Sequence, residues 1–400
     1  VRLADLRDYC TSDTHLHRNW FGPDQHYSNP YYVRKRFRNS DERWRAFGYY
    51  SANLNLAAWL KFNAKYSFDY YRTRIQTCDL GLADQAITTP TQSWQEKLTN
   101  DYMQHSEENH FEHNLSLMFM GDQLLSEKFR LGYTLGSNTM YLKYESFSGG
   151  VEDMLDKNNW IYNTGRRLVD GGNNGYNRAM YSAFASAQLA FDEYLSLDLT
   201  ARNDWSSTLP RQNNSFFYPS ASLSYVFSDF MKSTGHALPA WMTFAKARLS
   251  LAQVGKDPSP YNLYNTRKFV FEGGIRKPLV NTIKMNNNLK PEIKTSYEAG
   301  VDMKFLDNRL GFDFTYYYNV TKNQSMLVDA AAPWSQQWVN AGKITNSGVE
   351  LMIYSTPVKT RHFTFNLNLN LAHNRSIVKE LADGVNRIYF SGDPNMPVRV

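Results

Sequence analysis

Apolar side chains recur at every second position along much of this chain. In Leu195–Arg202 the odd positions are leucine or alanine, and the even positions are polar or charged. Successive side chains of a β-strand point to opposite faces, so this alternation predicts a strand with one apolar and one polar face. Matching the same pattern along residues 49–374 predicts about twelve strands.

Charged residues are distributed unequally between the two predicted faces. Asp, Glu, Lys and Arg are absent from the apolar faces of these strands and occur on the opposite ones. A basic residue that faces lipid at mid-depth costs about 2–4 kcal/mol, whereas one that faces a water-filled interior costs little. We therefore expect a membrane barrel. The residues expected to face its lumen are Asp198, Arg202, Lys246, Arg248, Asp302, Asp313 and Glu350.

The predicted connections alternate between short and long. Short turns are expected at 59–61, 192–193, 306–309 and 356–357, and long loops at 72–109, 138–177, 255–294 and 321–345. Outer-membrane barrels have short periplasmic turns and long extracellular loops, whereas β-sandwiches do not sort their loops by length. The pattern predicts an all-β, antiparallel transmembrane β-barrel. We expect residues 1–48 to form an extracellular loop region and residues 49–400 a partial barrel.

The composition is compatible with this barrel. Charged residues make up 20% of the chain, below the roughly one quarter that is usual in soluble proteins. A transmembrane helix is excluded because no run of about 18 apolar residues exists. Clusters such as Tyr70-Tyr71 and Tyr316-Tyr317-Tyr318 near strand ends are typical of aromatic girdles. The net charge of +6 is spread over scattered Lys and Arg, which argues against nucleic-acid binding.

Several motifs, in one order along the chain, resemble the SusC/RagA-like family of TonB-linked outer-membrane transporters. The resemblance extends from about Tyr49 to Asn374. The motifs are LDLTARNDWSSTLP (197–210), FYPS (217–220) with LSYVF (223–227), LKPE (289–292) with YEAG (297–300), FLDNRL (305–310) and ITNSGVE (344–350).

The resemblance implies a 22-stranded barrel, closed by an N-terminal plug, in the outer membrane of a Gram-negative bacterium of the Bacteroidota type. It implies import of oligosaccharides or peptides, a SusD-like surface lipoprotein as a lid, and energy supplied by TonB. We expect the plug, the segment that contacts TonB and the closing strands to lie outside this sequence. The residues here are then expected to supply the wall, the lumen surface and the loops on which the lid docks.

Catalytic and metal-binding arrangements are weak in this sequence. His105, His110 and His113, with neighbouring glutamates, gather in a predicted loop, but their spacing fits no standard metal site, so a polar loop is the favoured interpretation. No nucleophile–base pair or paired carboxylates can be argued from spacing, so we expect neither an enzyme nor a bound cofactor. Cys10 and Cys78 lie in predicted loops, and both a disulfide and two separate thiols are compatible with the sequence.

Aromatic residues in the long loops are candidates for contact with substrate or with the lid, because exposed rings stack on sugars and pack against peptide side chains. Loop self-packing is the competing explanation for each ring. Two other functions also stay open: a passive porin, and an extracellular all-β carbohydrate-binding protein. The candidate rings are Trp160, Tyr162, Trp205, Tyr261, Tyr264, Trp334 and Trp338.

Overall fold

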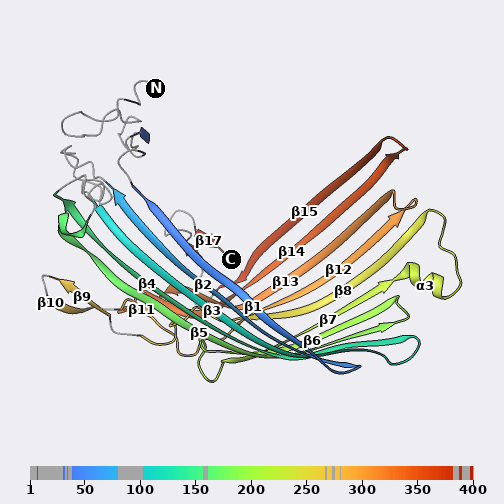
Figure 1. Ribbon diagram of the computed structural model, residues 1–400, viewed down its shortest axis with the longest axis horizontal. Helices are drawn as coiled ribbons and strands as arrows, with labels where there is room; N and C mark the ends of the chain where they lie inside the picture. Colours follow the sequence, from blue (N-terminus) through green and yellow to red (C-terminus); the bar gives the residue numbers. More distant parts are fainter. Residues whose placement is uncertain are drawn as a thin grey trace. The chain divides into compact units, whose positions relative to one another are not determined.

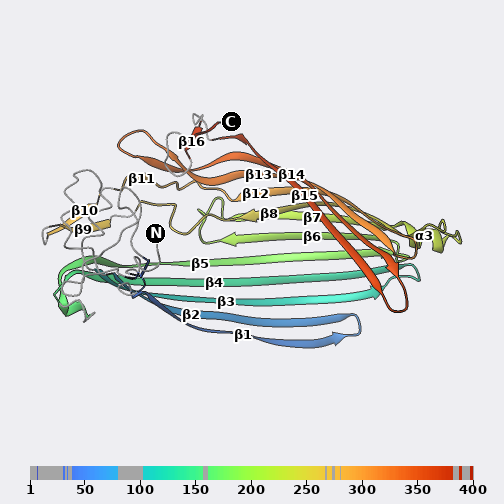
Figure 2. The same cartoon turned by 90° about the horizontal axis from the view of Figure 1, so that it is seen from above.

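In the computed structural model, most of the chain forms one sheet that is antiparallel except for the pairing of β11 with β14 (Figures 1 and 2). The structure describes residues 38–79, 102–155, 161–265, 268–272, 275–279, 281–381, 387–389 and 397–399, together with positions 7, 30, 31 and 34. The sheet has 13 strands in the order β1-β2-β3-β4-β5-β6-β7-β8-β12-β13-β14-β11, with β15 also paired to β14. Strands that follow one another in the sequence are therefore neighbours almost throughout.

The strands of this sheet are long. β5 has 27 residues and β4 has 26, whereas about 9–11 suffice to cross a bilayer. Their bounds are β1 Ser40–Ala57, β2 Leu60–Asp79, β3 Tyr102–Leu124, β4 Phe129–Met154, β5 Gly165–Phe191, β6 Leu195–Ser206, β7 Ser215–Val226, β8 Met242–Lys256, β11 Ile283–Lys284, β12 Glu292–Phe305, β13 Leu310–Asp329, β14 Gln336–Lys359 and β15 Thr364–Glu380.

The remaining elements are small. β9 (Lys268–Glu272) and β10 (Ile275–Leu279) form one hairpin, and β16 (Arg387–Tyr389) pairs with β17 (Pro397–Arg399). The helical segments among the described elements are η2 (Tyr162–Thr164) and α3 (Phe227–Ser233). Within the described ranges, no helix has both the length and the apolar character needed to cross a membrane.

The chain divides into two compact units. Unit 1 comprises residues 1–48, 67–113 and 142–177, and unit 2 comprises residues 49–66, 114–141 and 178–400. Each unit has a small buried core among its described residues. In unit 1 it consists of Cys78, Met103, Val151 and Met154. In unit 2 it consists of Leu209, Phe216 and Leu289.

Strand register in unit 2 aligns apolar residues on one face of the sheet. Leu199 is the register partner of Ala187 on one side and of Ala221 on the other. Val301 likewise lies between Ala247 and Phe314. We call this the apolar face, and the opposite one the polar face. The apolar side chains are not in a protein core, because Leu199, Phe314 and Leu369 are 40%, 38% and 46% exposed. An uncovered apolar surface of this extent is typical of contact with lipid or with a partner.

Tight turns join the strands at one end of unit 2 (Figure 2). They occupy residues 58–59, 125–128, 192–194, 306–309 and 360–363. Asp192 and Glu193 have φ of 48° and 60°, and Leu306, Asp307 and Asn308 also have positive φ. Such conformations match the twist of paired strands in hairpins. The connection at 227–241 is longer than these turns and contains α3, so the alternation of loop lengths is not fully regular.

Parts of the segments expected as long loops are strand. β2 continues to Asp79, β3 begins at Tyr102, β4 extends to Met154 and β13 to Asp329. β1 likewise begins at Ser40, ahead of the expected boundary at residue 49. Alternation identifies a strand only where its two faces have different surroundings. A strand with polar residues on both faces shows no such pattern.

The turn expected at Thr356–Pro357 is also displaced. β14 continues through Pro357 to Lys359, and the register shifts between Ser355 and Val358. Such an irregularity accommodates a proline, which has no N–H to donate to the neighbouring strand. The turn itself lies at residues 360–363, where the Thr360 N–H donates to the Phe363 carbonyl.

Candidate functional site

At the end of unit 2 opposite its tight turns, loops and the adjoining strand ends form a platform held together by side-chain hydrogen bonds. The platform comprises residues 206–215, 257–265, 283–291 and 334–340. The Asn286 amide donates to the Trp338 carbonyl, and the Asn286 N–H donates to the Asn262 carbonyl. Asn340 holds Lys290 from both sides, because it accepts from the Lys290 N–H and donates to the Lys290 carbonyl.

A buried carboxylate connects this platform to the strands. Asp257, at the end of β8, accepts two hydrogen bonds from the Arg178 guanidinium, at 3.0 and 2.6 Å. It also accepts from the hydroxyls of Ser206 and Thr208, at 2.5 and 2.8 Å. Because Asp257 is buried, removing one of these donors would leave carboxylate oxygens desolvated and unpaired.

A second network fixes the preceding part of the same motif. Asp204 accepts from the Arg202 Nε at 2.8 Å and from the Tyr218 hydroxyl at 2.5 Å. Arg202 also donates to the Ser182 hydroxyl at 2.8 Å. Arg202, which we expected to be a lumen residue, therefore lies on the polar face with its charge paired. The motif LDLTARNDWSSTLP thus encodes two carboxylate networks that hold a loop in place.

Amide side chains hold the next loop against this motif. The Asn213 amide donates to the Asn288 Oδ1 at 3.2 Å and to the Leu289 carbonyl at 3.1 Å. Leu289 is fully buried and packs with Leu209 and Phe216. The loop containing LKPE is therefore anchored to the loop containing SSTLP, so the two motifs are parts of one structure.

The predicted aromatic residues occupy different places. In unit 2, Tyr261 and Tyr264 are 59% and 64% exposed on the platform, and Trp205 is 37% exposed. The Trp205 ring lies 5.6 Å from that of Tyr181; Trp334, just before β14, and Trp338, within β14, are partly buried. In unit 1, the Tyr162 hydroxyl donates to the Gly149 carbonyl. Trp160 lies outside the described residues.

The polar face of unit 2 carries a ladder of opposite charges. The Arg248 guanidinium donates to both Asp313 oxygens, at 2.9 and 2.6 Å, and to the Thr315 hydroxyl. Arg248 reaches them across Gly300, where an added Cβ would lie 2.5 Å from the Arg248 Nε. Register places the other predicted lumen residues on this face: Asp302 opposite Lys246 and Asp313, Glu350 opposite Thr315, and Asp198 opposite Gln188 and Ser222.

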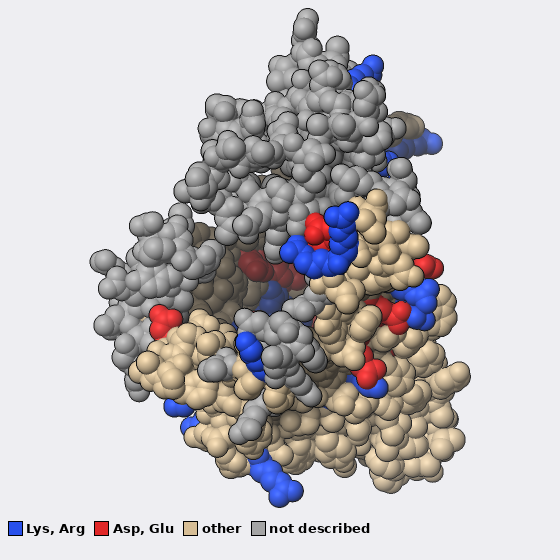
Figure 3. All heavy atoms as spheres, turned by 90° about the vertical axis from the view of Figure 1, so that its left-hand side faces the viewer, with Lys and Arg blue, Asp and Glu red and all other residues tan. Residues whose placement is uncertain are grey.

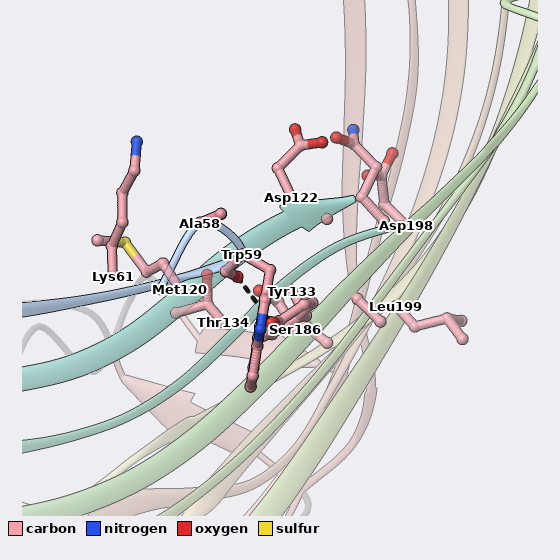
Figure 4. Close-up of a pocket in the computed structure, with 15 residues that line it drawn as sticks. Ala58, Trp59, Lys61, Met120, Asp122, Tyr133, Thr134, Ser186, Asp198 and Leu199 are labelled. Atoms are coloured by element: carbon pink, nitrogen blue, oxygen red, sulfur yellow. Dashed lines mark hydrogen bonds between the residues drawn. The ribbon is translucent and has the colours of Figure 1, made fainter. Parts of the chain in front are cut away.

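A 590 Å³ cavity opens near the tight turns of unit 2 (Figure 4). Lys61, Asp122 and Asp198 point to the same side of the strands there, and the Tyr133 hydroxyl donates to the Trp59 carbonyl. Arg130 forms two hydrogen bonds with Asp122, at 2.7 and 2.8 Å. The charges around this cavity are therefore of both signs.

In unit 1 the histidine cluster lies in a strand and not in a loop. Within β3, Glu107 and His113 share one face while Glu108 and His110 share the other, and the His110 ring stacks on Tyr71. No group of three or more His, Cys, Asp or Glu in the described ranges is arranged to hold a metal ion. Cys78 is buried at the end of β2, and Cys10 lies outside the described residues, so the disulfide stays a hypothesis.

Charged side chains of unit 1 form cross-strand pairs. Arg72 of β2 contacts Glu107 of β3 at 2.5 Å, and Arg74 lies 3.5 Å from the same carboxylate. The hydrogen bond from Arg72 lowers the pKa of Glu107. In the space-filling view, acidic and basic residues are interspersed on the visible face, and the described residues form no patch of a single sign there (Figure 3).

Comparison with known proteins gives consistent matches. A family model described as "TonB dependent receptor-like, beta-barrel" matches residues 4–395. The TonB-dependent receptor P3 of Formosa agariphila is 27% identical over 216 residues, which is 51% of this chain and 21% of that protein. The TonB-dependent receptor SusC of Bacteroides thetaiotaomicron is 24% identical over 199 residues, 48% of this chain and 20% of SusC. The matched region is about a fifth of either relative.

Solved structures share the fold. A structure of the RagAB peptide transporter superposes with a TM-score of 0.77 at 18% identity, covering 92% of this chain and 40% of that one. The siderophore receptor PiuA of Acinetobacter baumannii gives a TM-score of 0.53 at 12% identity, covering 90% of this chain and 50% of that one. At such identities the likeness shows the architecture alone.

Proposed function

The chain belongs to the TonB-dependent receptor-like β-barrel family, and on that premise we propose that it forms part of the wall of an active outer-membrane importer. The apolar face contacts hydrocarbon and the polar face lines a water-filled passage. Uptake is energised through TonB, and the imported substrate is an oligosaccharide or a peptide. A SusD-like lipoprotein covers the mouth of the barrel.

The separation of charge between the two faces carries this proposal. The Arg248–Asp313 pair and the neighbouring Lys246 and Asp302 lie on one face, while Phe314 and Val301 project from the other. Only a wet interior accommodates such a ladder at little cost, and only lipid or a protein partner suits the exposed apolar face. The family supplies the reason to choose lipid.

The platform is the proposed contact surface for substrate and lid. Tyr261 and Tyr264 present exposed rings on loops that hydrogen bonds hold in place. A preorganised surface loses less entropy on binding than a mobile one. Trp205, on the same face of β6 as Leu199, and the partly buried Trp334 and Trp338 are further candidates for this contact. Tyr162 of unit 1 and Trp160 stay candidates of the same kind.

Energy-dependent uptake by the full-length protein is the decisive test. Bacteria that carry or lack the gene are supplied with labelled oligosaccharide and peptide mixtures, and internalised label is measured with and without an uncoupler of the inner-membrane proton gradient. We expect uptake of one substrate class that requires both the gene and the gradient. Gene-dependent uptake that survives the uncoupler would indicate a passive porin instead. A full-length protein that stays in solution without detergent would favour the extracellular binding protein.

The role of the platform is tested by a double substitution. Tyr261→Ala with Tyr264→Ala is expected to lower uptake at limiting substrate by at least about tenfold, which corresponds to 1.4 kcal/mol, with unchanged amounts of barrel in the membrane. Phe363→Ala, which removes a ring that is 60% exposed at a tight turn, is the matched control. Equal uptake by both variants would assign the two tyrosines to loop packing.

A further inference from the structure

Two lysines face each other across β13 and β14 in unit 2. Lys322 and Lys343 are direct register partners, and neighbouring pairs place both side chains on the apolar face. Like charges directly opposite each other in a sheet are destabilising. Glu380 lies 3.2 Å from Lys343, but Lys322 has no ionic partner among the residues that the structure describes. Within the described residues, only one of the two ammonium groups is therefore paired with a carboxylate.

These lysines line a cavity of 500 Å³. The ladder is irregular there, because pairing passes from Lys322–Lys343 to Gln324–Ala341, and both Asn323 and Gly342 have positive φ. This volume lies within the range of small-molecule sites, about 300–1,000 Å³. The other residues that line it are Val328, Gln337, Val339, Asn340 and Leu381 together with Glu380.

The position along β13 sets the depth of the cavity in a membrane. A strand rises about 3.4 Å per residue, and barrel strands tilt by about 35–45°. From Leu310 at the tight turn, Tyr318 is then about 19–22 Å up the membrane normal and Lys322 about 29–33 Å. The apolar band of such barrels is about 25 Å tall. Tyr318 falls in its upper part, and Lys322 falls just beyond it.

We propose that Lys322 and Lys343 bind the phosphate of an anionic membrane lipid whose headgroup occupies this cavity. The lipid belongs to the leaflet on the side of the long loops. An ammonium group is an effective partner for phosphate, and the anion would relieve the repulsion between the two lysines. The inference rests on the proposed placement of the apolar face in the membrane.

The surface below the cavity favours a lipid over a free anion. Tyr318, Tyr316 and Phe314 follow Lys322 down the same face of β13, and each is exposed. The Tyr297 ring lies 6.4 Å from Tyr318 on that face. Acyl chains below a bound phosphate would lie against these rings, whereas inorganic phosphate gains nothing from them.

Lipid titration of the purified full-length protein in detergent tests the site. Binding of dimyristoyl phosphatidic acid, dimyristoyl phosphatidylcholine and inorganic phosphate is measured by native mass spectrometry. The variant is Lys322→Gln with Lys343→Gln. The control is Lys256→Gln with Lys294→Gln, which removes the same charge at a similar height from the polar face. Heat-modifiable migration in gels verifies that each variant is a folded barrel.

We expect the site variant to weaken phosphatidic acid binding at least tenfold and the control to change it less than twofold. Phosphatidylcholine should bind equally to all three proteins. Equal weakening in variant and control would show general attraction to charge and overturn the proposal. Competition by inorganic phosphate at the same affinity would overturn a lipid as the ligand. Failure of the wild type to form a membrane barrel would instead count against the proposed function.

Discussion

Leu199→Arg tests the assignment of the apolar face most directly. Leu199 lies four positions after Leu195, the first residue of β6, so it is about 10 Å up the membrane normal. That depth is near the middle of an apolar band of about 25 Å. Its neighbours across the sheet are the small residues Ala187 and Ala221, which offer an arginine no polar partner.

The cost follows from this depth. An arginine that faces lipid near the midplane destabilises a barrel by about 2–4 kcal/mol, which lowers the folding equilibrium constant about 30- to 900-fold. Thr200→Arg is the matched control, because Thr200 is the next residue and lies on the polar face. It loses one hydrogen bond to the Ser220 hydroxyl, at 2.5 Å, worth about 0.5–1.5 kcal/mol.

Both variants are made in the full-length protein. The amount of heat-modifiable barrel in outer-membrane fractions gives assembly, and urea titration in lipid vesicles gives the free energy of unfolding. Leu199→Arg should lose most of its assembled barrel, while Thr200→Arg should retain it. Equal free energies of unfolding for the two would mean that lipid does not contact the face carrying Leu199, and the reasoning would be refuted.

Three further substitutions test the networks. Asp257→Asn weakens the contact with Arg178 and should destabilise the platform by about 1.5–3 kcal/mol. Proteolysis at 257–291 should then be faster than in the wild type. Unchanged cleavage would contradict the role of Asp257 in the platform. Asn213→Ala should speed hydrogen exchange at 286–291, consistent with loss of about 1 kcal/mol, and equal rates would argue against the anchor. The lowered pKa of Glu107 means that its pair with Arg72 stabilises above the ordinary carboxyl pKa and is lost as pH falls through the lowered value. Below about pH 4, the protection of amides in β2 and β3, relative to their intrinsic exchange rates, should fall in the wild type but not in Glu107→Gln. The same pH response in both would exclude this pair.

The fold was largely predictable, because the side chains of a barrel strand alternate between lipid and the water-filled interior, and their polarity alternates with them. The all-β barrel and the family resemblance are confirmed by the family match and by the shared fold. The turns at 192–193 and 306–309 were also predicted, since short polar connections between alternating segments specify hairpins. Helix α3 was missed, because Phe227–Ser233 is too short to show a helical period.

The platform was not predictable in the same way. Arg178 and Asp257 are 79 positions apart, and Asn213 and Leu289 are 76 apart. Neither pair has a local pattern that connects it, although Asn213 and Leu289 lie near or in family motifs and Asp257 bonds to Ser206 and Thr208 of one motif. The motifs therefore marked segments that take part in the hydrogen-bond networks, but not the distant residues with which those segments bond.

The distribution of charge along the strands nevertheless indicates where each strand leaves the membrane, a position beyond which the alternation of apolar and polar residues is lost. Close to the tight turns, charged residues of a strand lie only at positions of the polar face. Further along several strands, a charged residue occurs at a position of the apolar face. The first such residue, counted from the tight turn, is Glu42 in β1, Arg72 in β2, Glu107 in β3 and Lys322 in β13. On the proposed placement, these positions mark where a strand leaves hydrocarbon. Strand pairing continues past them, because backbone hydrogen bonds need no apolar face. Wall and rim are then one continuous sheet, and charged residues such as Lys322 lie where a lipid headgroup can reach them.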